Sequence, residues 1–212
     1  MTTIYKLTDD DGYTRREHIN ALKWEPGVTH KATGEGNELC TDGVIHGYTD
    51  PVLAVMMNST HGCYYPCRMF LCKGEIIAEV PDKVGVKELT CIEEMIPPVV
   101  TTEQHVRFGI LAAKEVCNDP KWNEWADNWL SGKDRSKESA QESAQMVEDS
   151  IRNMESDVVW AAWDAIWAAK YAAWAAKCMA GATKCTAIAV RSVAVVNPNI
   201  DLVALAHKAM ED

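Results

Sequence analysis

Hydrophobic residues in the first hundred positions form short runs that end at turn-forming residues. Thr3–Leu7 is the first run, and an Asp-Asp-Asp-Gly turn signal follows it at positions 9–12. Arg68–Cys72, Glu75–Val80 and Lys87–Ile92 are further runs, and the last two alternate in part between apolar and polar residues. A two-residue period is typical of half-buried strands, so this part of the chain predicts a small β-rich domain.

A glycine-rich segment and one short helix interrupt these strands. Five glycines fall between Trp24 and Gly47, and this density predicts loops and tight turns. Pro51–Met57 is apolar and follows Thr49 and Asp50, which are residues that cap helix N-termini. Proline is tolerated in the first helical position, so we expect a short helix there.

The hydrophobic period changes after Pro97-Pro98, because two successive prolines end a helix or a central strand. Beyond them, apolar positions recur every three or four residues, which predicts helices. The first helix is expected to begin at Thr102, because the acidic residue Glu103 follows it in the first turn. The expected helices span about residues 102–117, 120–131, 136–180 and 200–210, and 136–180 is either one helix or two that break near 153–156. The predicted class is α+β, with a small β-rich N-terminal domain (1–98) and an α-helical C-terminal region (99–212).

The expected helix at 136–180 is rich in alanine and tryptophan and has a wide apolar face. Such a face predicts packing against more than one neighbour. We therefore expect the protein to form a homo-oligomer through this helix. Base stacking by these aromatic residues is a weaker alternative, because no basic residues lie beside them in the pattern that nucleic acid requires. The residues expected to mediate oligomerisation are Trp160, Trp163, Trp167, Tyr171 and Trp174.

The charge balance argues against direct nucleic-acid binding. The chain has 21 Lys and Arg against 31 Asp and Glu, and its formal net charge is −10. A nucleic-acid-binding surface needs clustered basic residues, and the densest cluster, at 133–137, is interrupted by acid. An acidic surface that docks on a basic partner is permitted, but solubility is the simpler explanation.

The N-terminus is polar and has no apolar segment of the kind that a secretory signal carries. The most apolar stretch, Val158–Ala176, contains Asp164 and Lys170, so we expect a helix that packs against protein rather than one that crosses a membrane. Eight cysteines in a chain of this length predict reduced thiols. The expected location is the cytoplasm.

One group of soft donors resembles a metal site only weakly. His61, Cys63, Cys67 and Cys72 lie within twelve residues, but neither cysteine spacing is the C-x2-C of a zinc knuckle. We therefore predict no metal and no cofactor. Pairs such as Cys40 with His46, or Cys63 with His61, are possible nucleophile and base pairs by residue type alone.

The glycine-rich segment and its surroundings are the best candidates for a recognising surface. Glycines allow a ligand to approach the backbone, while histidine and tyrosine form hydrogen bonds and tryptophan stacks. This composition suits a small polar ligand such as a nucleotide, and it suits equally a loop-rich fold that satisfies its own polar groups. The residues expected to recognise the ligand or partner are Trp24, His30, Asp42, His46, Tyr48, Asn58 and His61.

Three further patterns are Y-K-x-T at residues 5–8, L-C-x-D-G-x-I-H-x-Y-x-x-P-x-L-A-V at 39–55, and tryptophan-containing motifs up to residue 136. Together these segments resemble an uncharacterised family of phage and prophage proteins with a domain of unknown function. In that family an Ala-rich helical tail of variable length follows, as it does here. The cysteines at 63, 67 and 72 are not part of the pattern.

The resemblance implies a phage accessory protein that counteracts host defence. We expect it to act without catalysis, by binding a host defence protein or by sequestering a small nucleotide signal. One alternative is an enzyme that acts on NAD or a nucleotide, loosely like an ADP-ribosyltransferase, with Glu35, Glu75 or Glu79 as its catalytic acid. Another alternative is a structural or assembly protein.

Overall fold

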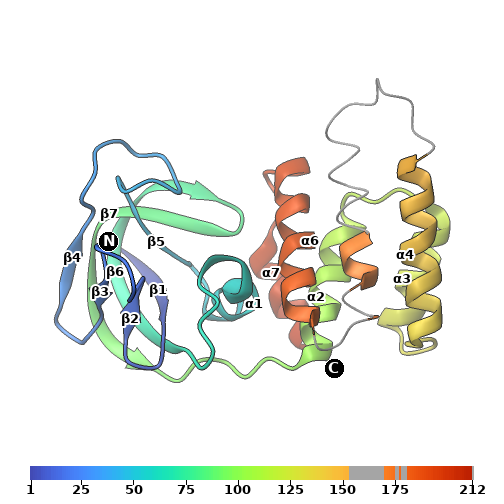
Figure 1. Cartoon of the computed structure of the whole chain (residues 1–212), viewed down its shortest axis with the longest axis horizontal. Coiled ribbons are helices and arrows are strands. Elements are labelled where there is room, and N and C mark those ends of the chain that lie inside the picture. Colours follow the sequence, from blue (N-terminus) through green and yellow to red (C-terminus); the bar gives the residue numbers. More distant parts are fainter. Residues whose placement is uncertain (153–169, 175–176, 178–180, 212) are drawn as a thin grey trace. The chain divides into compact units, whose positions relative to one another are not determined.

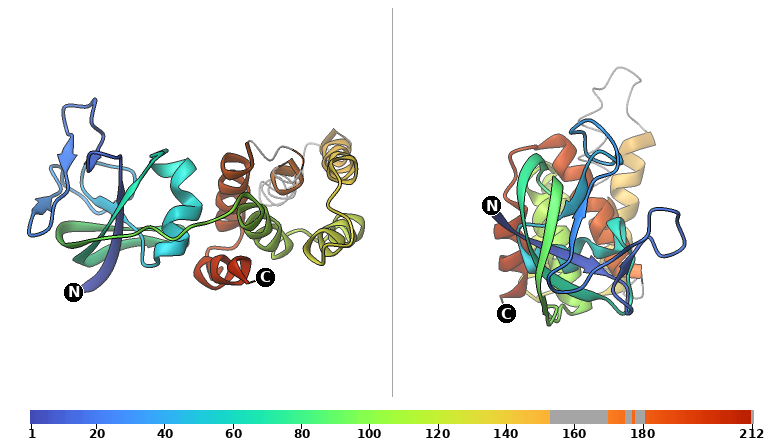
Figure 2. Two further views of the ribbon diagram at one scale, coloured as in Figure 1. Left: turned by 90° about the horizontal axis from the view of Figure 1, so that it is seen from below. Right: turned by 90° about the vertical axis from the view of Figure 1, so that its left-hand side faces the viewer.

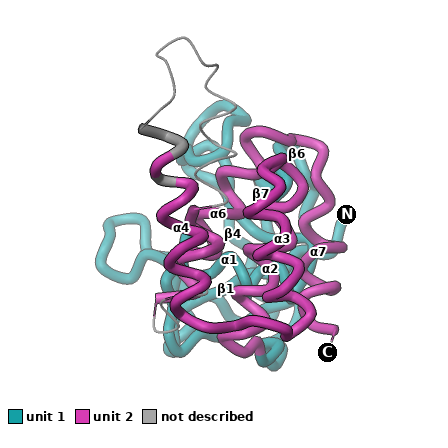
Figure 3. Tube along the Cα trace, turned by 90° about the vertical axis from the view of Figure 1, so that its right-hand side faces the viewer, with its two compact units in different colours: residues 1–99 teal, residues 100–212 magenta. Residues whose placement is uncertain are grey.

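The computed structural model describes residues 1–152, 170–174, 177 and 181–211. The chain divides into two compact units, Met1–Val99 and Val100–Asp212, which Figure 3 colours separately. The predicted boundary after residue 98 lies one residue before this division. The first unit is built on strands and the second on helices, so the predicted α+β class is confirmed.

A single antiparallel sheet forms the scaffold of the N-terminal unit. Its strand order is β1-β6-β7-β4, and β5 also pairs with β7. Strands β2 and β3, of two residues each, pair with one another in a separate sheet. In the sequence they lie between β1 and β4. The strands are β1 (Thr2–Thr8), β2 (Tyr13–Thr14), β3 (Leu22–Lys23), β4 (Thr29–Lys31), β5 (Ile45–Gly47), β6 (Arg68–Val80) and β7 (Lys83–Met95).

The long β6–β7 hairpin bends, and this bend lets the sheet close on itself (Figures 1 and 2). Three register shifts interrupt the hairpin between Leu71 and Ala78, and such bulges curve a strand pair. Gly74 allows the close approach, because a Cβ there would lie 2.8 Å from the carbonyl oxygen of Glu88. Tyr48, just after β5, exchanges two backbone hydrogen bonds of 2.7 and 3.0 Å with Tyr5 of β1. β5 therefore joins β7 to β1, and the sheet forms a small barrel.

The core of the N-terminal unit fills the concave side of this sheet. Trp24, in the segment after β3, is completely buried in it. Because successive strand residues point to opposite faces, each strand contributes alternate residues. The cluster contains Ile4, Trp24, Ile45, Phe70, Cys72, Val84, Val86, Leu89 and Cys91.

Helix α1 (Pro51–His61) is fixed at both ends by side chains. Asp50 accepts hydrogen bonds from the backbone N–H groups of Val52 and Leu53, so the predicted acidic cap is the one in use. At the other end, buried Asn58 bonds to the backbone of Tyr64 through both side-chain atoms. The helix and the loop that follows it are thereby held in place beside β1.

The C-terminal unit consists of helices that pack on each other. α2 contacts α3, α6 and α7, and α3 contacts α4. A capping box of Thr101 and Gln104 starts α2, and Asp119 caps α3 ahead of Pro120. The helices are α2 (Thr102–Lys114), α3 (Pro120–Leu130), α4 (Lys137–Arg152), α6 (Ala182–Val196) and α7 (Leu202–Met210).

Tryptophan and small residues determine the packing of these helices. Trp122, Trp125 and Trp129 all lie on the buried face of α3, as their spacing predicts. On α2, Gly109 lies against Thr186 of α6, whose hydroxyl donates a 2.9 Å hydrogen bond to the carbonyl oxygen of His105. Small residues at this contact let the two helices approach closely.

Several predicted boundaries were wrong. β6 runs unbroken where we expected two strands, because its bulges keep it paired with β7. The capping residue of α2 is Thr101 rather than Thr102. The predicted helices did not include α6, since Gly181 and the β-branched residues after it disfavour a helix, but packing on α2 outweighs that propensity. Whether 136–180 is one helix or two depends on 153–169, which lie outside the described residues.

Candidate functional site

Basic side chains from three places in the N-terminal unit gather around His46 of β5. Lys6 lies on β1, Arg15 directly follows β2, and Lys83 begins β7. The charges of all three lower the pKa of His46. Lys6 is also in direct contact, since its Nζ donates a 2.6 Å hydrogen bond to the carbonyl oxygen of His46. We call these four residues the cationic cluster.

The imidazole of His46 is neutral at neutral pH. Its pKa is lowered to about 4, first by burial and then by Lys6, Lys83, Arg15 and His61. Its Nε2 accepts a 2.8 Å hydrogen bond from the backbone N–H of Cys40. A neutral ring that accepts at Nε2 carries its proton on Nδ1, so His46 offers a hydrogen-bond donor rather than a strong base.

Lys6 lies partly inside the barrel. Its pKa is lowered to about 8, chiefly because burial disfavours the ammonium form. The ammonium lies 5.4 Å from the ring centroid of Trp24, in a cation–π contact. Because its pKa is still about 8, most of the Lys6 population is charged at pH 7 and adds to the positive potential of the cluster.

Next to the cluster, His61 connects three elements through its two ring nitrogens. Its Nδ1 lies 2.9 Å from the hydroxyl oxygen of Tyr48, which follows β5. Its Nε2 lies 3.0 Å from a carboxylate oxygen of Asp82, in the turn between β6 and β7, without the alignment of a hydrogen bond. Burial, with Asp82 second, raises the pKa of Tyr48, so this phenol keeps its proton. The trio ties the end of α1 to the barrel.

The backbone is strained at this site. Among the described residues, the non-glycine residues with positive φ are Arg15 (55°), Cys40 (66°) and Cys63 (53°). A left-handed conformation costs a residue with a Cβ roughly 1–2 kcal/mol. Cys40 is bonded to His46, Cys63 comes two residues after His61, and Arg15 is one of the charges that lower the pKa of His46. Strain of this kind accumulates at functional sites, where the surrounding structure holds a residue in an unfavourable conformation.

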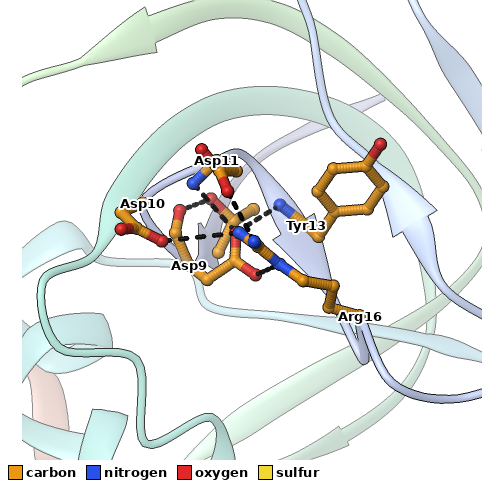
Figure 4. A network of polar contacts seen from close by, with 6 residues as sticks. Asp9, Asp10, Asp11, Tyr13 and Arg16 are labelled. Atoms are coloured by element: carbon orange, nitrogen blue, oxygen red, sulfur yellow. Dashed lines mark hydrogen bonds and ion pairs between the residues drawn. The ribbon is translucent and has the colours of Figure 1, made fainter.

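The two neighbouring arginines, Arg15 and Arg16, have different partners, and Figure 4 shows those of Arg16. Arg16 forms ion pairs with Asp9, Asp10 and Asp11 at distances between 2.5 and 3.4 Å. Its hydrogen bond to Asp9 is the main reason why the pKa of that carboxyl is lowered. The three carboxylates thus neutralise Arg16 and order the turn before β2, while Arg15 contributes its charge to the neighbourhood of His46.

The structure brings three of the predicted recognition residues together, namely His46, Tyr48 and His61. Trp24 is a correction: it is completely buried, its Nε1 donates to Thr14, and it therefore cannot stack on a ligand. His30 packs edge-on against Trp24 at 4.7 Å, and its Nε2 bonds to the carbonyl oxygen of Lys23.

Two other predicted recognition residues have structural roles. Asn58 is buried and holds the loop after α1, so its side chain is not available to a partner. Asp42 is exposed, and its carboxylate occupies the space that a side chain on Gly34 would need. The glutamates considered as catalytic acids, Glu35, Glu75 and Glu79, are all exposed.

The weak metal candidates do not gather. Among the described residues, no group of three or more His, Cys, Asp or Glu side chains is placed to hold a metal ion. Cys72 lies in the sheet core opposite Cys91, whereas the thiol of Cys63 donates to the carbonyl oxygen of Ser59, and Cys67 is half-buried. His61 is already engaged by Tyr48 and Asp82.

The predicted oligomerisation residues are described only in part. Trp160, Trp163 and Trp167 lie outside the described residues. Tyr171 is half-buried, and Trp174 is 40% exposed between the ammonium groups of Lys170 and Lys177. Self-association stays a prediction.

Sequence reasoning missed Lys6, Arg15, Asp82 and Lys83. Each lies in a strand or turn with no motif that names a ligand, and only the closure of the barrel brings them together. The sequence does contain one signal for Asp82. Pro-Asp between two apolar runs predicts a turn, and a turn places its side chains at one end of a hairpin.

We compared the chain with known protein families, with curated proteins and with solved structures. The chain matches none of them. The resemblance to a phage family therefore stays a prediction. In the part of the chain that the structure describes, the helices are too short or too polar to cross a membrane.

Proposed function

We propose that the N-terminal unit is a non-catalytic binding module for a small anionic ligand of the nucleotide class. The cationic cluster is the observation that carries this proposal. Residues 1–100 hold 9 basic and 15 acidic side chains, a balance of −6. Within this acidic unit, Lys6 bonds to the backbone of His46, and Lys83 bonds to Cys40, whose N–H is bonded to the His46 ring. The charge of Arg15 also acts on this imidazole. Gathering three cations in an acidic domain costs free energy, which an anionic ligand would offset.

The hydrogen-bonding groups also suit an anion. Nδ1–H of His46 and the guanidinium of Arg15 are donors, and guanidinium groups bind phosphate oxygens in pairs of hydrogen bonds. Because the tryptophan expected to stack is buried, the cluster recognises the charged part of a ligand rather than its base.

Binding fits the site better than catalysis does. A general base needs a nitrogen free to accept a proton, whereas Nδ1 of His61 is bonded to the hydroxyl of Tyr48 and Nε2 faces the carboxylate of Asp82. The pKa of His46, near 4, makes it a weak base, and Tyr48 keeps its proton. These features support stoichiometric capture of a ligand.

The proposed setting follows from the phage resemblance. The protein would act in the cytoplasm of the host cell, where it would sequester a nucleotide signal of a defence system or bind a defence protein. The helical unit would assemble the binding modules into a homo-oligomer. Its acidic charge fits a role without direct contact to nucleic acid.

Calorimetric titration of the full chain with AMP, NAD and a cyclic dinucleotide tests the proposal. We expect one of these to bind, and Arg15→Gln to weaken the affinity about tenfold, since a hydrogen bond to a charged group contributes about 1.5–3 kcal/mol. Lys31→Gln is the matched control, because Lys31 pairs with Glu88 and is absent from the charges that act on His46.

The recovered ligand distinguishes capture from turnover. Denaturing the complex should release the nucleotide intact, whereas hydrolysed or transferred products would favour the enzyme alternative. Absence of binding by every probe, or equal affinities for Arg15→Gln and the unmodified protein, would refute the proposal.

A further inference from the structure

The segment between β4 and β5 closes on itself to form a compact loop. The N–H of Gly34 donates a 2.9 Å hydrogen bond to the carbonyl oxygen of Asp42. Gly43 lies so close to the carbonyl group of Glu35 that no Cβ would fit there. We call residues 34–43 the 34–43 loop. Because its two ends are joined, the loop forms one unit.

The outward face of β7 carries two lysines with a glycine between them near the start of the strand. Val84 belongs to the core cluster. Successive strand residues alternate between the two faces, so Lys83, Gly85 and Lys87 all point away from the core. His46 of β5 pairs with Gly85. This face therefore presents two ammonium groups and an imidazole around a position that has no side chain.

The 34–43 loop occupies the ammonium groups of both lysines. Lys87 donates to the carbonyl oxygens of Gly36 and Gly43, to the second at 2.7 Å. Lys83 donates to the Sγ of Cys40 at 3.0 Å. An ammonium group binds an anionic oxygen more strongly than it binds a carbonyl oxygen, because a hydrogen bond between two charged groups is the stronger one. An anion can therefore compete with the loop for these lysines.

Leu39 and Cys40 of the same loop cover the rest of this face. A side chain on Gly85 would lie 2.9 Å from Cδ2 of Leu39, so the leucine fills the space that the glycine leaves open. The N–H of Cys40 donates to Nε2 of His46 at 2.8 Å. The loop thus takes each of the groups with which an anion could bind at this face.

The charge of the 34–43 loop also opposes an anion. Glu35, Glu38 and Asp42 are exposed, and the loop contains no basic residue. These carboxylates lower the positive potential of the face that the loop covers. Opening the loop therefore removes its hydrogen bonds and its negative charge together.

We propose that the 34–43 loop is a lid over an anion site above Gly85, and that the phosphate group of the proposed nucleotide displaces it. In the open form the ammonium groups of Lys83 and Lys87 bind the phosphate oxygens. Nε2 of His46, released from the N–H of Cys40, can carry the imidazole proton and donate to the same phosphate. This inference rests on the proposed function, because its ligand is the phosphate of the same nucleotide.

Cleavage by endoproteinase Glu-C measures lid opening in the native full chain, because Glu35 and Glu38 lie on the loop. Mass spectrometry follows the fragments, and cleavage after Glu17, which is exposed between β2 and β3, is the internal reference. We expect saturating AMP to speed cleavage of the loop about threefold or more relative to Glu17, since the ligand selects the open form. Unchanged or slower cleavage with AMP bound would show that the loop is not displaced, and would overturn the inference.

Two variants open the lid in different ways. Leu39→Ser removes the apolar contact with Gly85 and no charge, so it should speed cleavage of the loop and tighten AMP binding about threefold. Lys87→Met removes the bonds to the loop together with one cation, so it should speed cleavage but weaken AMP binding. Ile92→Ser, at a half-exposed position further along β7, is the matched control and should change neither quantity.

Calorimetric titration separates failure of the lid from failure of the site. If Leu39→Ser and the unmodified protein bind AMP with equal affinity while circular dichroism shows a native fold, the lid is refuted and the proposed function stands. If neither protein binds AMP, NAD or a cyclic dinucleotide, both proposals are refuted.

Discussion

The two units use their polar residues in different ways. In the C-terminal unit polar groups cap helices, as Thr101 and Asp119 do at the starts of α2 and α3, and join neighbouring helices in pairs, as Lys114 and Asp127 do. In the N-terminal unit polar side chains from β1, β5, β7 and the neighbouring loops gather on one imidazole and on one His–Tyr–Asp trio. The helical unit is thus organised by packing, and the barrel unit by packing together with a polar site.

Backbone strain follows the same division. The described non-glycine residues with positive φ all belong to the N-terminal unit. In the C-terminal unit, the described left-handed residue is Gly132, which adopts that conformation without strain. The comparison supports placing the proposed binding site in the N-terminal unit.

The largest expected effect compares one buried tryptophan from each unit. Trp24→Ala and Trp122→Ala each empty a completely buried site, and each should lower the free energy of unfolding by about 3–5 kcal/mol. Chemical denaturation measures both losses. Val195→Ala, at a site that is 69% exposed, should cost less than about 0.5 kcal/mol.

The same pair also tests where the ligand binds. Trp24 lies beside Lys6, so Trp24→Ala should weaken nucleotide binding under conditions where the variant is folded. Trp122→Ala should leave that affinity unchanged. The opposite pattern would place the site in the helical unit and reverse the comparison.

The next largest effect is a loss of stability in acid. The pKa of His46 is lowered from 6.5 to about 4, so the unfolded chain takes up a proton at a pH where the folded chain does not. The free energy of unfolding should therefore fall as the pH drops from 6.5 towards 4, by at most about 3 kcal/mol. His46→Gln should flatten this part of the stability profile measured by urea denaturation. A profile that keeps its slope in the variant would show that His46 is not the titrating group.

A smaller effect concerns the trio around His61. Tyr48→Phe removes the hydroxyl that bonds Nδ1 and should lower the free energy of unfolding by about 1–2 kcal/mol. Tyr13→Phe, on a half-buried residue of β2, is a matched control with little expected change. Equal stability of Tyr48→Phe and the control would mean that the trio does not tie α1 to the barrel.

The smallest effect is a shift in how binding depends on pH. Lys6 is charged below its pKa of about 8 and neutral above it, so affinity for an anion should decline as the pH rises through 8. The loss of one charge a few ångströms away corresponds to about 1 kcal/mol in a solvated site. Lys6→Met should remove the step in a calorimetric titration series at pH 6.5–9. A step that persists in this variant would assign it to another group.

The class of the fold could be predicted from the sequence, because hydrophobic period and turn residues are local signals. The caps of α1 and α3 follow from an aspartate directly before a proline, and the buried face of Trp122, Trp125 and Trp129 follows from spacings of three and four. α6 could not be predicted in this way, since its packing on α2 outweighs a weak local propensity.

The site was predictable only in part. His46, Tyr48 and His61 were identified by residue type next to glycine-rich turns. Lys6 and Lys83 lie far apart in the sequence and meet only because the barrel closes through Tyr5 and Tyr48. Trp24 was assigned to the surface by chemistry alone, because a sequence does not show which face of a loop turns inward.

The most direct test of the cationic cluster is a nuclear magnetic resonance titration of the full chain with AMP. Signals of Lys6, Arg15, His46 and Lys83 should move in a saturable way, and those of Trp122, Trp125 and Trp129 should stay in place. Saturable shifts confined to the tryptophan-rich helices, or no saturable shifts at the cluster with AMP, NAD or a cyclic dinucleotide, would contradict the account.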